Sequence, residues 1–189
     1  MEVVADPFLM IADDPSDLAR EAADLFVRSA REGIEARGGF FAALSGGATP
    51  RETHRLLAEP PYLGAIPWKD THLFWVDERC VAYTHPASNF GAAKEDLLSK
   101  IPIAEERVHP MPTTLLPEEG AARYAKDLET FLPRDRGGVP RLDLIFLGIG
   151  DDGHTASLFP GQESLEEQKR WIVAVKGGSP DVHRLTMTL

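Results

Sequence analysis

The chain has a single cysteine, no long apolar run and no excess of basic residues. Cys80 alone cannot form an internal disulfide, which is typical of proteins that work in a reducing compartment, so we expect a cytoplasmic protein. The sequence has no run of about 18 apolar residues to span a membrane, and its first residues lack the basic and apolar segments of a signal peptide. The net charge of −10 argues against nucleic acids and anionic membranes as partners.

The composition is that of one ordinary globular domain. With 189 residues, 43% of them hydrophobic, the chain is long enough to bury a substantial core. We therefore expect a single domain over residues 1–189, acting as a monomer. The histidines have no paired spacing such as His-Glu-x-x-His, so we expect neither a metal site nor another cofactor.

Strand-like and helix-like segments alternate along the sequence. Strands are predicted at 8–12, 40–44, 72–76, 142–148, 171–175 and 184–189, with a short one within 105–110. Helices are predicted from Pro15 to the Gly38 stop, after Thr49, and over 89–98 and 117–132. This order predicts an α/β fold with a mainly parallel sheet and helices on both faces.

A glycine-rich loop that ends on a histidine follows the apolar segment 144–147. Gly148, Gly150 and Gly153 allow sharp turns, and Asp152 and His154 come with them at the carboxyl end of the predicted strand. Open α/β sheets build their ligand sites at that edge, so the loop is a candidate source of a base and of a carboxylate that orients it. The alternative is an ordinary strand-to-helix turn with a capping aspartate and a solvated histidine.

A second loop, Ser45-Gly-Gly-Ala-Thr-Pro50, lies between a predicted strand and a predicted helix. Thr49 suits the N-cap of that helix and Pro50 its first position. Free amides at Gly46 and Gly47, with the Ser45 and Thr49 hydroxyls, are suited to binding a phosphate at a helix N-terminus. The loop is neither a Walker A motif nor a serine-hydrolase elbow. A capped helix after a tight turn is the equally open alternative.

The third polar segment is Asp77-Glu78-Arg79, directly after the predicted strand 72–76. An arginine there can stabilise an oxyanion or bind a phosphate. Alternatively, Arg79 only pairs with its acidic neighbours. Cys80 beside it is interpreted as a small apolar residue and not as a nucleophile.

Together, these three segments resemble the 6-phosphogluconolactonase family. The similarity rests on Ser45-Gly-Gly-Ala-Thr-Pro, on Val76-Asp-Glu-Arg with Ser88-Asn-Phe, and on the run from Leu147 to Pro160, Leu-Gly-Ile-Gly-Asp-Asp-Gly-His-Thr-Ala-Ser-Leu-Phe-Pro. It covers nearly the whole chain. The resemblance implies a Rossmann-like fold and metal-free hydrolysis of 6-phospho-D-glucono-1,5-lactone in the pentose phosphate pathway.

Roles for single residues follow from this resemblance and from the chemistry of lactone opening. His154 is expected to be the general base that activates water, and Asp152 to orient it. Arg79 is expected to stabilise the negative charge on the lactone oxygen. The expected substrate contacts, including those to the 6-phosphate, are Ser45, Gly46, Gly47, Thr49, Asp77, Glu78 and Arg184.

The chain also departs from the family pattern. Ala82 stands where proline is usual, and the sequence stops at Leu189, whereas relatives continue with a Gly-x-x-Lys-Ala segment. We therefore expect a domain that lacks a C-terminal portion, which keeps a catalytically silent sugar-phosphate binder open. A further alternative is an amino-sugar-phosphate deaminase of the same superfamily, but these enzymes carry an acid where this chain has Phe159.

Overall fold

The computed structural model describes residues 8–135 and 137–189. The first helix, α1 (Pro15–Arg37), begins where Asp14 accepts a hydrogen bond of 2.8 Å from the Asp17 amide. It ends at Gly38, whose φ of 76° is left-handed. The prediction of this helix is confirmed. The predicted strand at 8–12 is wrong, because these residues have no regular structure and most of them are exposed.

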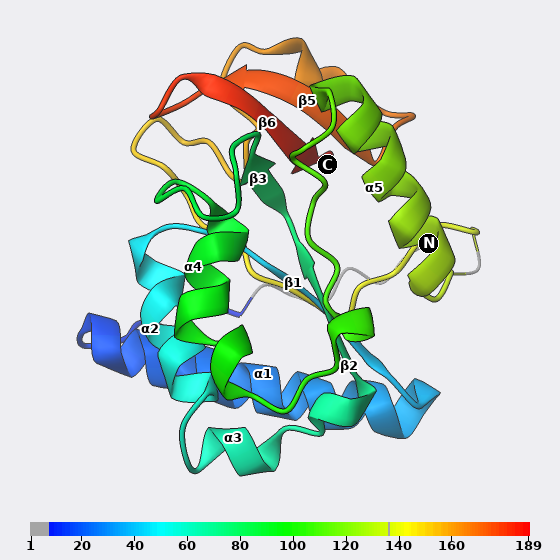
Figure 1. The fold of residues 1–189 in the computed structure, drawn as a ribbon. Helices are drawn as coiled ribbons and strands as arrows, with labels where there is room; N and C mark the ends of the chain where they lie inside the picture. The colour runs from blue at the N-terminus through cyan, green and yellow to red at the C-terminus, as the bar shows by residue number, and fades with distance from the viewer. Residues whose placement is uncertain (1–7, 136) are drawn as a thin grey trace.

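A parallel sheet forms the centre of the molecule (Figure 1). Its strands are β1 (Phe40–Leu44), β2 (Thr71–Trp75) and β4 (Leu144–Ile145), in the order β2-β1-β4. Phe40 pairs with Thr71 and Ala42 with Leu144. All three strands run in the same direction, so their carboxyl ends meet at one edge. The predicted fold class, a mainly parallel sheet surrounded by helices, is confirmed.

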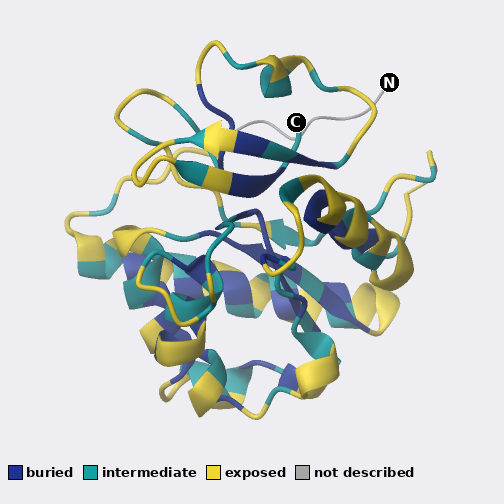
Figure 2. Cartoon of the chain, turned by 45° about the horizontal axis from the view of Figure 1, so that its top comes forward, coloured by how far each residue is buried: buried dark blue, intermediate teal, exposed yellow. Residues whose placement is uncertain are grey.

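Helices lie around this sheet (Figure 1). They are α1, α2 (Ala48–Leu57), α3 (Tyr62–Ala65), α4 (Asn89–Asp96) and α5 (Pro117–Phe131). α1 packs on α2 and β1, and the Phe26 ring meets that of Phe40 edge to face at 5.1 Å. Buried residues line the inner sides of these elements (Figure 2). No helix in the described ranges is both long and apolar enough to cross a lipid bilayer.

A second, antiparallel sheet adjoins the carboxyl edge of the first. It contains β3 (Asp77–Arg79), β5 (Ile172–Gly177) and β6 (Val182–Met187), in the order β3-β6-β5. Val76 links the two sheets, because its N–H donates to the Leu44 carbonyl at 2.9 Å and its carbonyl accepts from the Met187 N–H at 2.8 Å. α5 packs on β5 and β6. The last two strands are thus correctly located by the sequence, but they pair antiparallel in a sheet of their own.

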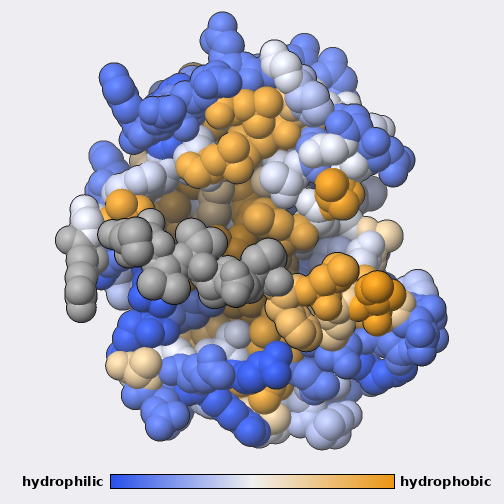
Figure 3. Space-filling view, turned by 180° about the vertical axis from the view of Figure 1, so that it is seen from behind, coloured by the Kyte–Doolittle hydropathy of each residue, from blue (hydrophilic) through white to orange (hydrophobic). Residues whose placement is uncertain are grey.

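Two predicted strands are shorter than expected. Within 105–110 the chain forms a 3₁₀ turn, Glu105–Arg107, and a single parallel bridge from Val108 to Leu73. Of residues 142–148 only β4 is a strand, at the edge of its sheet, and its Ile145 is 46% exposed, so this apolar run is not fully buried. Viewed from behind, apolar side chains gather on the surface (Figure 3). Exposed apolar side chains in and near β4 include Ile145, Leu147 and Ile149.

The other 3₁₀ turns are Trp68–Asp70, Leu98–Lys100 and Glu163–Glu166.

Candidate active site

A cavity of about 500 Å³ lies where the carboxyl ends of the central strands meet the second sheet. Its lining joins all three segments that the sequence analysis selected: Ser45, Gly46, Gly47, Ala48, Thr49, Pro50, Asp77, Arg79, Asn89, Leu147, Gly148, Ile149, Gly150, His154, Ala156 and Arg184. A larger hollow of about 940 Å³ lies over β5 and the Glu163–Glu166 turn. It is lined by none of these three segments, so we place the chemistry in the smaller cavity.

His154 is held by the carboxylate two residues before it. Asp152 Oδ1 lies 2.5 Å from His154 Nδ1 and accepts the His154 backbone N–H at 3.1 Å. This contact lowers the pKa of the Asp152 carboxyl and fixes the proton of the neutral imidazole on Nδ1. Gly150 must be glycine, because a Cβ there would lie 2.2 Å from His154 Cε1. The result is an oriented imidazole whose Nε2 is left as a proton acceptor.

The Ser45–Thr49 loop leads from β1 directly into α2. The helix begins at Ala48, with Gly47 as N-cap at a φ of 102° and no side chain bonded to the free amides. The prediction of Thr49 as N-cap and Pro50 as first helical residue is therefore wrong. Gly47 starts the helix earlier because it tolerates a backbone conformation that other residues avoid. The unpaired amides of the first turn border the cavity, as an anion site requires.

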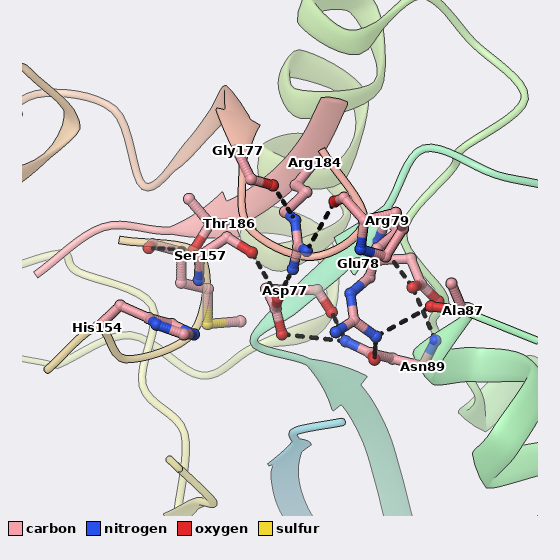
Figure 4. A network of polar contacts seen from close by, with 12 residues as sticks. Asp77, Glu78, Arg79, Ala87, Asn89, His154, Ser157, Gly177, Arg184 and Thr186 are labelled. Carbon is pink, nitrogen blue, oxygen red and sulfur yellow. Dashed lines mark hydrogen bonds and ion pairs between the residues drawn. The ribbon is translucent and has the colours of Figure 1, made fainter. Parts of the chain in front are cut away.

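Asp77 connects the second sheet to the histidine loop and lies in β3, not in a loop. Its Oδ2 accepts a hydrogen bond of 2.6 Å from Ser157 Oγ, and its Oδ1 one of 3.1 Å from Asn89 Nδ2. Arg184 Nη1 lies 4.0 Å from Oδ2. Figure 4 shows Asp77 between Arg184 and Asn89, with His154 beyond Ser157. Asp77 thus holds together side chains from three different elements.

The two arginines of the cavity differ in how far the protein already uses their donors. Arg184 is only 3% exposed and donates Nε to the Gly177 carbonyl at 2.8 Å and Nη2 to the Pro180 carbonyl at 3.3 Å. Burial, with the positive charge of Arg79, lowers the pKa of Arg184. Arg79 uses only Nη1, towards Ala87 and Asn89. Among the described residues Arg79 therefore keeps two nitrogens without a hydrogen bond, Nε and Nη2, whereas Arg184 keeps one, Nη1.

Glu78 lies outside the cavity lining and is fully buried. Its two carboxylate oxygens accept hydrogen bonds from the backbone amides of Arg79, Asn89 and Phe90 and from the Ser88 hydroxyl. Burial raises the pKa of Glu78, against the effect of these hydrogen bonds. Glu78 was predicted to contact the substrate, but its carboxylate is bonded to protein groups and does not border the cavity.

Sequence reasoning left Asn89 and Ser157 out of the site. Both stand inside motifs that carry the family resemblance, Ser88-Asn89-Phe90 and the run after His154, and that position was the available signal. No group of three or more potential metal ligands is found in the described ranges.

The sequence from 13 to 189 matches the family described as glucosamine-6-phosphate isomerases/6-phosphogluconolactonase. The chain belongs to this family. Members with similar sequences include a 6-phosphogluconolactonase of Synechocystis, 45% identical over 158 residues, which are 82% of this chain and 63% of that protein. A probable chloroplastic 6-phosphogluconolactonase of rice is 38% identical over 95% of this chain and 57% of its own length. This chain therefore spans less than two thirds of the length of these two members.

Solved structures of the glucosamine-6-phosphate isomerase/6-phosphogluconolactonase family have the same fold. The 6-phosphogluconolactonase from Trypanosoma cruzi superposes with a TM-score of 0.86 at 29% identity, over 97% of this chain and 75% of that one. The fold described above is thus that of the family.

Proposed function

We propose that this protein hydrolyses 6-phospho-D-glucono-1,5-lactone to 6-phospho-D-gluconate. This is the reaction for which its relatives are named, and it is a step of the pentose phosphate pathway. One observation supports this most strongly: an imidazole oriented by a carboxylate borders the same cavity as a cationic side chain and a helix N-terminus. Hydrolysis of a phosphorylated lactone requires a base, an oxyanion partner and a phosphate site, and these three groups supply them.

In the proposed reaction, His154 Nε2 takes a proton from water while the water oxygen bonds to the lactone carbonyl carbon. Asp152 holds the Nδ1–H and stabilises the imidazolium that forms. Arg79 stabilises the negative charge that develops on the carbonyl oxygen. The tetrahedral intermediate then collapses, the bond to the ring oxygen breaks, and the imidazolium returns the proton to that oxygen. The products are a carboxylic acid and a hydroxyl group.

The 6-phosphate is assigned to the other side of the cavity. The amides after Gly47 and the hydroxyls of Ser45 and Thr49 are suited to accept it, with Gly46 allowing close approach. Arg184 adds positive charge to this side of the cavity. Its Nη1 is the nitrogen left for the phosphate, because Nε and Nη2 donate hydrogen bonds to backbone carbonyls. Replacement of Arg184 with alanine should therefore raise KM. An unchanged KM would remove Arg184 from the phosphate site.

Two other functions lead to different measurements. A deaminase of the same family would need an acid at Phe159, whose ring instead packs on His154 at 4.9 Å. Release of ammonia from glucosamine 6-phosphate would favour it. A catalytically silent sugar-phosphate binder would use the same cavity and its cationic side chains without turnover. Binding of 6-phosphogluconate without lactone turnover above the spontaneous rate would establish it.

We also propose that the protein acts as a cytoplasmic monomer. The rice relative is named chloroplastic. Light scattering of the purified chain tests the oligomeric state.

A further inference from the structure

We infer that Asn89 is the positioning residue for Arg79, and thereby sets the direction in which the guanidinium presents its free Nη2 to the substrate. The inference rests on the proposed lactonase function. Asn89 is 4% exposed and borders the cavity from the N-terminus of α4. Its side chain lies at the junction of three segments that are distant in the sequence.

The Asn89 amide uses both of its ends. Oδ1 accepts a hydrogen bond of 2.5 Å from Arg79 Nη1, while Nδ2 donates to the Asp77 carbonyl oxygen at 2.9 Å and to Asp77 Oδ1 at 3.1 Å. These contacts fix which end is oxygen, because Arg79 can only donate and the Asp77 oxygens can only accept. Asn89 therefore ties Arg79 to Asp77, which faces the histidine loop through Ser157 (Figure 4).

The backbone of Asn89 is held in place by the buried carboxylate of Glu78. Its backbone N–H donates to Glu78 Oε1 at 2.8 Å, and the next amide, of Phe90, donates to Glu78 Oε2 at 2.7 Å. A buried carboxylate at the N-terminus of a helix is favoured by the helix dipole as well as by these bonds. Glu78 thus fixes the start of α4, and the first residue of α4 fixes Arg79.

The consequence lies in the donors that remain on Arg79. Nη1 is used twice, by Asn89 Oδ1 and by the Ala87 carbonyl at 2.9 Å. Nε has no hydrogen-bond partner among the described residues, although it is buried. Because Nε is shielded from the cavity, Nη2 is the donor nitrogen that remains for a ligand. By occupying Nη1, Asn89 leaves Nη2 as the donor available to the substrate.

The test is a double-mutant cycle on kcat/KM for 6-phosphogluconolactone, with wild type, Arg79→Ala, Asn89→Ala and the double variant. Loss of a charge-assisted contact predicts that Asn89→Ala is slower by about 10- to 100-fold. The double variant should be within about twofold of Arg79→Ala, because Asn89 has nothing left to position. Independent, multiplying effects would overturn the inference.

Added guanidinium ion gives a readout that a structural role of Asn89 would not change. It should partly restore kcat/KM to Arg79→Ala, and this rescue should be lost in the double variant. Ser88→Ala is the matched control, since Ser88 caps the same helix through the Gly91 amide but does not contact the Arg79 guanidinium. It should destabilise the protein and leave the rescue of Arg79→Ala intact. Equal rescue with and without Asn89 would contradict the inference.

Failure of the proposed function can be told apart from failure of this inference. Wild-type protein without turnover above buffer would refute the lactonase. In that case the same four variants are compared by calorimetric binding of 6-phosphogluconate and by urea unfolding. Non-additive losses would support the coupling of Asn89 to Arg79, and additive losses would refute it.

Discussion

The substitution Gly46→Ala tests the packing at the junction of the site. Gly46 has no positive φ, so alanine is compatible with its backbone. A Cβ at this position would, however, lie 1.8 Å from Asn89 Oδ1 and 2.3 Å from Asn89 Cγ. No pair of unbonded atoms tolerates such distances, so the Asn89 side chain would have to move. Its contacts with Arg79 and Asp77 would then be lost.

The cost can be worked out from those contacts. A hydrogen bond to a charged group contributes about 1.5–3 kcal/mol, and a neutral one about 1 kcal/mol. Gly46→Ala should therefore lower the free energy of unfolding by about 2–4 kcal/mol. In the Asn89→Ala background the obstructing atoms are absent, and the same substitution should be neutral or stabilise by about 0.4–1 kcal/mol, because alanine restricts the unfolded chain.

Urea unfolding of the four proteins measures both values. Gly47→Ala is the matched control, since Gly47 has a φ of 102° and a Cβ there would meet nothing within 4 Å. Its cost is one of backbone strain, about 1–3 kcal/mol, and should be the same with or without Asn89. The reasoning is refuted if Gly46→Ala costs the same free energy in both backgrounds.

Two further predictions concern stability. Tyr124→Phe removes the hydroxyl that accepts from the Trp75 N–H at 2.8 Å and donates to the Trp75 carbonyl at 3.1 Å; the free energy of unfolding should fall by about 1–3 kcal/mol, and a change within the error of urea titration would contradict this. Burial lowers the pKa of His54 to about 4, and neither ring nitrogen has a partner among the described residues. Because the folded-state pKa is below the unfolded value of about 6.5, stability is full above that pH and is lost as the pH falls towards 4. His54→Leu should therefore stabilise the protein more at pH 5 than at pH 8, and an equal gain at both would contradict this assignment.

Features set by neighbouring residues were predictable from the sequence. α1 begins at Pro15 and stops at Gly38, as its local sequence predicts. Asp152 and His154 are two residues apart, so one turn brings them together. The start of α2 was misplaced for an equally local reason, because Thr49 and Pro50 match the preferred N-terminal residues, whereas the conformation of Gly47 decides the boundary.

Features set by distant partners were not predictable. The apolar run around Ile145 looks like a buried strand, but burial depends on which elements pack on its faces, and Ile145 remains exposed. Val76 is where the chain passes from one sheet to the other, and nothing in its sequence indicates this. The Ser157–Asp77 hydrogen bond joins residues 80 positions apart. The motifs identified the segments of the site, and the tertiary structure decided how they contact each other.

Hydrolysis of 6-phosphogluconolactone by this 189-residue chain tests the proposed function most directly. The wild type, His154→Ala and the control His183→Ala are compared with buffer, in which the lactone also opens spontaneously. His183 is exposed and does not border the cavity. We predict a wild-type rate well above buffer that is retained in His183→Ala and falls to near the buffer rate in His154→Ala. Most of the rate remaining in a folded His154→Ala protein, or no rate above buffer from folded wild type, would contradict the proposal.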